Sequence, residues 1–236
     1  MAKVYNPNFY HARHNKTLYS AETIVKIISD IVTPKSVVDL GCGVGTWLEV
    51  FTQLGVEDVL GLEGHWVEDE KIVIPLTKFK KVNLEDKLTL DRKFDLAISL
   101  EVAEHINEQY AEQFVENLTN LAPVVMFSAA IPLQEGKFHV NEQWPDYWKT
   151  IFEKKDYLLV DIIRPKVWSD ERIEMWYAQN TFVYVDRNKI DDYPQLKDHY
   201  VPNPPLLSAV LPRFYEFKLS KYPIGRAIKN KIKRTF

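Results

Sequence analysis

Short apolar runs alternate with amphipathic stretches along most of this chain. The runs have the length and the β-branched or aromatic content of strands, which we expect near 36–40, 58–63, 79–83, 94–100, 123–129, 156–163 and 177–186. Apolar residues at helical spacing predict helices near 19–32, with Ser20 as a candidate cap, and near 46–54 and 108–120. Because strands that alternate with helices form parallel sheets with right-handed crossovers, the pattern predicts an α/β fold.

The run that ends at Leu40 is followed by glycines at alternate positions, Gly41, Gly43 and Gly45. Glycine has no Cβ, so the backbone can turn sharply there and pass close to a ligand. The helix expected from Thr46 would present its free N–H groups to that ligand. This segment therefore predicts a nucleotide-binding loop.

The spacing of the glycines narrows the choice of ligand. A dinucleotide-binding loop has the pattern G-x-G-x-x-G, whereas this loop is G-x-G-x-G preceded by Asp39. No Lys-Ser or Lys-Thr pair follows the glycines, as a phosphate-binding P-loop requires. The pattern argues against NAD and against ATP hydrolysis. It resembles the class I methyltransferases that depend on S-adenosylmethionine (SAM), whose first motif is an acid followed by G-x-G-x-G after the first strand.

The resemblance continues downstream and covers residues 37–106. Glu63 ends the second run, near the ~20-residue offset expected of an acid that binds ribose hydroxyls. Asn83 and Leu84 match the end of the third strand, where the family reads the adenine, although Asn83 replaces the commoner Asp. The segment 94–106 matches the fourth strand and the turn after it. The implied cofactor-binding residues are Asp39, Gly41, Gly43, Glu63, Asn83, Leu84, Ser99 and Glu101.

The resemblance also implies an architecture. Members of this family have a Rossmann-like fold with a seven-stranded, mostly parallel sheet, helices on both faces and an antiparallel hairpin at one edge. The runs 156–163 and 177–186 are the candidates for that hairpin, because only short or irregular sequence connects them. We expect an N-terminal lid or helix over 1–34, a SAM-binding core over 35–188 and a C-terminal extension over 189–236.

The acceptor site is expected in the segment after the fifth strand, because ligands of open α/β sheets bind beyond the carboxyl ends of the strands. Residues 136–148 mix a histidine, acids, amides and aromatic rings. A hydroxyl acceptor is a poor nucleophile and needs a base, which predicts His139 as the base. Glu142 or Glu101 would orient its imidazole or hold hydroxyls of the acceptor. The alternative is an ordinary helix start, with Asn141 as cap and with Trp144 and Trp148 packed on the core.

A metal-dependent route is also visible. Glu101, Glu104 and His105, together with His139, resemble the magnesium-binding set of the ubiquinone-pathway O-methyltransferases and the plant small-RNA 2′-O-methyltransferases. Two carboxylates and two imidazoles suit Mg²⁺ or Mn²⁺ and leave coordination positions for an acceptor. In metal-free relatives, however, the same acid and histidine start a helix and pack beneath the sheet. Both alternatives remain open at this point.

Composition adds three restrictions. A chain of 236 residues with 46% hydrophobic residues has the length and apolar content for one sizeable α/β domain with appendages. A net charge of −3 carries no nucleic-acid signature, and the single cysteine, Cys42, excludes an intramolecular disulfide. Because no N-terminal signal or membrane-spanning run is visible, we expect a cytoplasmic enzyme.

The acceptor and the C-terminus complete the hypothesis. The run from His139 to Trp148 resembles methyltransferases of bacterial surface-polysaccharide and viral glycan gene sets, which implies a saccharide acceptor and O-methylation of a sugar hydroxyl. The alternatives are a small-molecule or RNA-ribose O-methyltransferase that uses the metal, and a non-catalytic, membrane-associated module that keeps the SAM fold. From Lys218 onward every charged residue is basic, so residues 213–236 predict peripheral contact with an anionic membrane; a solvated or frayed helix is the alternative.

Overall fold

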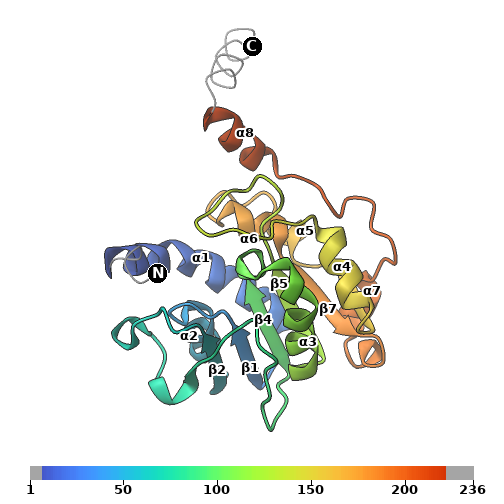
Figure 1. Ribbon diagram of the computed structural model, residues 1–236. Coiled ribbons are helices and arrows are strands. Elements are labelled where there is room, and N and C mark those ends of the chain that lie inside the picture. The colour runs from blue at the N-terminus through green and yellow to red at the C-terminus, as the bar shows by residue number, and fades with distance from the viewer. Residues whose placement is uncertain (1–6, 222–236) are drawn as a thin grey trace.

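The computed structural model describes residues 7–221, with the backbone alone described for residues 7–16. A single seven-stranded sheet runs through it in the order β3-β2-β1-β4-β5-β7-β6 (Figure 1). The strands are β1 (Ser36–Leu40), β2 (Asp58–Glu63), β3 (Phe79–Lys81), β4 (Leu96–Leu100), β5 (Val124–Ser128), β6 (Tyr157–Val160) and β7 (Phe182–Asp186).

Helices cover both faces of this sheet. The α-helices are α1 (Pro7–Val32), α2 (Thr46–Gln53), α3 (Ala111–Leu121), α4 (Pro145–Glu153), α5 (Arg164–Val167), α6 (Met175–Asn180), α7 (Pro194–His199) and α8 (Pro212–Lys221). Short 3₁₀ helices lie at Asp69–Lys71, Leu76–Lys78, Ala103–His105, Glu108–Tyr110 and Ile190–Asp192. No helix within residues 7–221 is long and apolar enough to cross a lipid bilayer.

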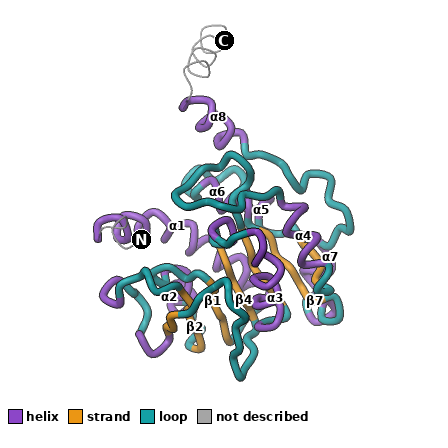
Figure 2. The backbone as a smooth tube through the Cα atoms, in the orientation of Figure 1, coloured by secondary structure: helices purple, strands orange, loops and turns teal. Residues whose placement is uncertain are grey.

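The strand pairing confirms the predicted fold class. β1 pairs in parallel with β2 and β4, and β4 pairs in parallel with β5. β7 runs antiparallel to both β5 and β6, which forms the expected antiparallel edge. All the parallel strands therefore end at one edge of the sheet, where the long loops gather (Figure 2).

Alternate residues of each strand face two separate cores. Val37 and Ile98 belong to the cluster beneath α1 and α2, whereas Val38 and Ala97 belong to the cluster beneath α3 and α4. Such continuous apolar strands are typical of a sheet that is covered on both faces.

Two predicted boundaries were wrong. The last strand begins at Phe182 rather than 177, because the residues before it form α6, where Tyr177 packs edge-to-face on Trp47 at a centroid distance of 5.1 Å. The first helix begins at Pro7 rather than 19, so Ser20 is not a cap. Its buried hydroxyl instead accepts a hydrogen bond from the Glu174 amide at 3.0 Å.

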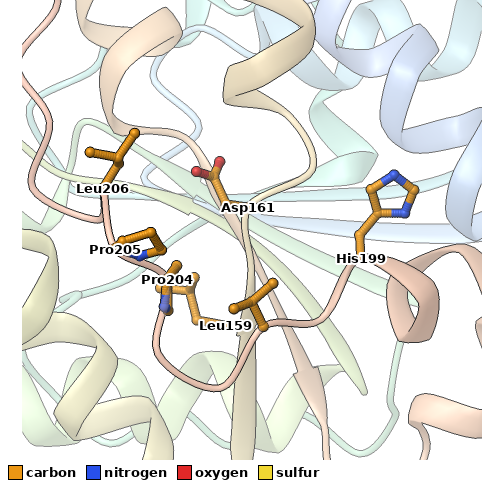
Figure 3. A pocket seen from close by; sticks show the side chains of 7 residues that line it. Leu159, Asp161, His199, Pro204, Pro205 and Leu206 are labelled. Atoms are coloured by element: carbon orange, nitrogen blue, oxygen red, sulfur yellow. The ribbon is translucent and has the colours of Figure 1, made fainter.

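The chain after β7 returns across the sheet edge to the loops. Residues 199–206 pass beside the edge strand β6 and enclose a cavity of about 200 Å³ there, between Leu159, Asp161 and His199 (Figure 3). Because β6 is the edge strand at one end of the sheet and β2 lies next to β3 at the other end, this cavity is separate from the glycine loop. Beyond it, α8 lies over the loop that follows β5 (Figure 1).

We expect alanine at Gly41 to destabilise the fold more than alanine at Gly55. Both glycines have a positive φ, 86° and 93°, which costs a side chain about 1–2 kcal/mol. A Cβ at Gly41 would also overlap the Val102 side chain, whereas at Gly55 no described atom lies within 4 Å of it. Chemical denaturation should show the larger loss for Gly41→Ala, and equal losses would contradict this account.

Candidate active site

The glycine loop is tied to the end of β2 by the carboxylate of Glu63. The amide of Gly43 donates to Oε2 of Glu63 at 2.6 Å, and the amide of Gly64 donates to Oε1 at 2.7 Å. Gly43 has a φ of 57°, and a Cβ added to it would have no described atom within 4 Å. Open space therefore lies against the backbone at the point where the sequence predicts the cofactor.

Two carboxylates are buried together beneath this loop. Asp39 and Glu63 are 2% and 5% exposed. Burial and the charge of Glu63 raise the pKa of Asp39 well above its usual value. Burial also raises the pKa of Glu63, although the amides of Gly64 and Gly43 oppose the shift. Burial also raises the pKa of the Cys42 thiol, which keeps it protonated, and Cys42 packs as a small residue in the first core.

The predicted adenine segment lies next to the end of β2, where the Val82 amide donates to the Glu63 carbonyl at 2.8 Å. Asn83 is exposed, and its side-chain oxygen accepts a hydrogen bond from the Glu85 amide at 3.3 Å. Leu84 is buried in the second core. Glu85 in turn accepts hydrogen bonds from Asn107, which connects this loop to the loop after β4.

The predicted cofactor residues at the end of β4 lie in different surroundings. The hydroxyl of Ser99 donates to the Leu40 carbonyl at 2.8 Å and thus joins β4 to β1. Glu101 has a φ of 56°, a strained conformation for a residue with a side chain, and its amide donates to Ser128. Strain of this kind persists only where the surroundings impose it, and it clusters at functional sites.

The carboxylate of Glu101 is the centre of a buried network. It accepts hydrogen bonds from Gln134 Nε2 at 2.6 Å and from Asn180 Nδ2 at 3.1 Å. Asn180 also donates to Gln134 Oε1 at 2.9 Å. Burial raises the pKa of Glu101, while hydrogen bonds from Asn180, Gln134 and Ser128 and the charge of His139 oppose the rise. Sequence reasoning missed Gln134 and Asn180, because Gln134 lies in the segment after the predicted strand 123–129 and Asn180 lies inside the predicted strand 177–186.

The structure brings the predicted base and its partner together. His139 Nδ1 lies 2.8 Å from Oε1 of Glu142. The same carboxylate accepts hydrogen bonds from the amides of Leu133 at 2.8 Å and Glu135 at 2.7 Å, which fixes its position. Because an ionised carboxylate only accepts hydrogen bonds, we assign the proton of neutral His139 to Nδ1. Nε2 is then the basic nitrogen.

Three of the four predicted metal ligands also lie together. One ligand atom each from Glu104, His105 and His139 falls within 4.8 Å of the others. His105 Nδ1 faces the Phe138 carbonyl at 3.2 Å, so its Nε2 is the nitrogen oriented away from that contact. One carboxylate and two imidazoles form a donor set that divalent cations accept. Glu101 is not part of this group, because Gln134 and Asn180 hold its carboxylate elsewhere.

The alternative interpretation of residues 141–148 as a helix start is wrong about its boundary. The helix α4 begins at Pro145 with Trp144 as N-cap, and the side chain of Asn141 binds Gln143 instead. Trp148 is packed in the core as that interpretation expects, but Trp144 is 43% exposed. Residues 129–144 thus form a loop over the carboxyl edge, and His139 lies within it.

The chain is similar to a known protein family over most of its length. The family described as a methyltransferase domain matches residues 11–168. No protein among the curated sequences matches this chain.

Three solved structures share its fold. The sugar N-methyltransferase KedS8 of a Streptoalloteichus species has a TM-score of 0.61 and 14% identity, with 79% of this chain and 94% of that chain covered. The SAM-bound amino pentose methyltransferase CalS10 of Micromonospora echinaspora has a TM-score of 0.53 and 13% identity, covering 79% and 99%. The methyltransferase domain of a bacterial Hen1 has a TM-score of 0.51 and 19% identity, covering 72% and 98%.

Asp39→Asn is expected to stabilise the folded protein at neutral pH. The raised pKa means that the folded state binds more protons than the unfolded state above about pH 4, so the wild type loses stability as the pH rises. The Tm of D39N should therefore exceed that of the wild type at about pH 7, and the difference should shrink towards about pH 4. D198N, at an exposed aspartate, is the matched control. A difference that does not change with pH would contradict the assignment.

Proposed function

This chain belongs to the methyltransferase-domain family, and we propose that it transfers the methyl group of SAM to a hydroxyl of a sugar within a glycan. That it is a SAM-dependent methyltransferase follows from the family match and from the SAM-bound structures that share its fold. The hydroxyl acceptor is our inference, and the observation that carries it is the 2.8 Å contact between His139 Nδ1 and Glu142.

The residues at the glycine loop fit the cofactor. The Glu63 carboxylate stands at the end of β2, where its oxygens can accept hydrogen bonds from ribose hydroxyls, and the open space at Gly43 allows close approach of a ligand to the backbone. SAM supplies an electrophilic methyl group on a sulfonium that leaves as a neutral thioether.

His139 and Glu142 supply what a hydroxyl acceptor needs. As the bond between the acceptor oxygen and the methyl carbon forms and the bond between carbon and sulfur breaks, Nε2 of His139 takes the hydroxyl proton. The resulting imidazolium is stabilised by the carboxylate of Glu142, which accepts the hydrogen bond from Nδ1. Because two backbone amides anchor Glu142, the imidazole is held in one orientation before the acceptor binds.

Exposed apolar side chains on the loop that carries His139 favour a saccharide as the acceptor. Leu133, Phe138 and Trp144, on the same loop, are 76%, 53% and 43% exposed. Exposed rings suit the apolar faces of sugars, while nearby acids and amides suit their hydroxyls. Two proteins that share the fold are named as methyltransferases of a sugar and of an amino pentose, which supports the acceptor class.

A metal-dependent O-methyltransferase is the second candidate, favoured by the grouping of Glu104, His105 and His139. These side chains would hold Mg²⁺ or Mn²⁺, which lowers the proton affinity of a hydroxyl bound to it. The two candidates exclude each other at one atom, because Nε2 of His139 either binds a cation or accepts a proton. The non-catalytic alternative finds no support in the family match. Peripheral membrane contact stays a prediction, since residues 222–236 lie outside the described part of the chain.

We expect His139→Ala to lower kcat about 10²–10⁴-fold, the usual contribution of a general base, while SAM affinity changes little. Glu142→Gln should also lower kcat, because it weakens the carboxylate that stabilises the imidazolium. Turnover with labelled SAM and calorimetric SAM titration measure the two quantities. His199→Ala, at an exposed histidine beside the separate cavity, is the control and should keep its activity. Wild-type turnover by H139A would refute the base.

Chelation separates the two candidates. If His139 acts as a base, two treatments should leave the methyl transfer rate within about twofold of the untreated wild-type rate: exhaustive treatment with EDTA, and replacement of His105 by alanine. A twofold change is far smaller than the loss of about 10²–10⁴-fold expected when a catalytic base is removed. Activity that is lost on chelation and restored by Mg²⁺ or Mn²⁺, but not in H105A, would establish the metal-dependent candidate instead.

A further inference from the structure

The helix α8 stands out above the loops at the end of the sheet (Figure 1), and its Lys218 Nζ donates to the Gln134 carbonyl at 3.4 Å. Just before the helix, the Leu211 amide donates to Gln179 Oε1 at 2.8 Å. In its first turn, the Phe214 side chain is buried in the first core. Towards its end, Lys218 Nζ pairs with Glu135 Oε1 at 2.8 Å on the loop after β5. The helix is therefore fixed at both ends.

Two of these contacts, those of Leu211 and Lys218, lead through one or two further residues to the candidate site. Gln179 donates to Asn180 at 3.0 Å, and Asn180 binds the Glu101 carboxylate. The amide of Glu135 donates to Glu142 Oε1, the atom that also faces His139. The start of α8 is thus joined to Glu101 through Gln179 and Asn180, and its end is joined to Glu142 through Glu135.

Arg213, in the first turn of α8, carries an unusual guanidinium. Its Nε and Nη2 atoms are buried and have no hydrogen-bond partner among the described residues. The Arg213 residue as a whole is half-buried, but a guanidinium stays charged and a buried N–H group without an acceptor is unfavourable. The edge formed by Nε and Nη2 is the one that binds a carboxylate or phosphate through two parallel hydrogen bonds.

Arg164 shows how this fold otherwise satisfies a buried arginine. Its Nε and Nη2 atoms bind the carboxylate of Asp161 at 3.0 and 2.6 Å, and its Nη1 donates to the carbonyls of Gln179 and Leu207. Every nitrogen of Arg164 therefore has an acceptor. The Nε and Nη2 atoms of Arg213 are also buried, but they have no acceptor among the described residues.

We propose that the Nε and Nη2 edge of Arg213 binds an oxyanion carried by the methyl acceptor, so that the acceptor is a sugar bearing a phosphate or a carboxylate. The bidentate contact would hold the anionic group while Nε2 of His139 receives the proton of a hydroxyl elsewhere on the same sugar. The other cations of α8, Lys218 and Lys221, are already paired with Glu135, which leaves Arg213 as the binding group. This inference rests on the proposed function only for the identity of the bound molecule as the acceptor.

The side-chain Nε–H resonance of Arg213, assigned by its loss in R213K, tests the contact in the full-length protein. Glucose 1-phosphate, glucuronate and neutral glucose are titrated separately with SAM present. We expect a saturable shift of this resonance with glucose 1-phosphate or glucuronate and none with glucose, and which anion acts identifies phosphate or carboxylate. An Arg213 resonance that responds to neither anion overturns the proposal.

Variants supply a second readout that does not depend on activity. R213M should raise the Tm of the unliganded protein, because it removes two buried nitrogen atoms that have no acceptor among the described residues. It should also lose at least about tenfold in affinity for the effective anion, as expected for loss of a bidentate ion pair. R187M, at an exposed arginine, is the matched control and should change neither quantity. Equal anion affinity in R213M and the wild type overturns the proposal.

The two proposals fail separately. H139A should bind the anion as the wild type does, since it keeps Arg213. Anion binding without methylation of any sugar would remove the proposed function and leave the oxyanion site. Methylation of neutral sugars at equal rates by R213M and the wild type would remove the oxyanion site and leave the proposed function.

Discussion

The parallel register of β1 with β2 and β4 brings three acids to one edge of the sheet. Asp39 lies opposite Gly61 on β2 and Ile98 on β4, so the residues that end these strands, among them Glu63 and Glu101, follow at the same level. All three carboxylates are buried, and those of Glu63 and Glu101 accept hydrogen bonds from groups beyond the strand ends. The Gly43 amide serves Glu63, and the amides of Gln134 and Asn180 serve Glu101. The positions of Glu63 and Glu101 at the strand ends thus fix the position of the glycine loop and of the loop after β5.

The second centre of order is Glu142, within the loop that carries His139. Its two oxygens accept hydrogen bonds from the amides of Leu133 and Glu135, so a segment without regular structure acquires a fixed shape. The remaining contact orients the imidazole of His139. The loop also supplies Glu135, whose ion pairs with Lys218 and Lys221 attach α8. The carboxylates of Glu142 and Glu135 therefore connect His139 to the helix that carries the proposed oxyanion site.

The sequence predicted those elements that depend on short-range patterns of residues. The strand β1, the glycine turn and the position of Glu63 follow from short-range patterns, and the structure confirms the sheet. The start of β7 was misplaced because the apolar residues around Tyr177 suit a strand as well as a helix, and a tertiary contact with Trp47 accompanies the helix. The roles of Gln134 and Asn180 could not be predicted, since each meets Glu101 across a long stretch of chain. The same holds for Arg213, whose lack of a partner among the described residues is visible only in the folded protein.

The most direct test of the account is to identify the atom that receives the methyl group. The protein is incubated with SAM labelled with ¹³C at the methyl group and with a panel of neutral and anionic saccharides, and the products are examined by ¹³C–¹H correlation NMR. The account predicts a labelled methyl ether on a sugar oxygen. A labelled methyl on nitrogen or on a carboxyl group, or no labelled saccharide although SAM is bound, would contradict it.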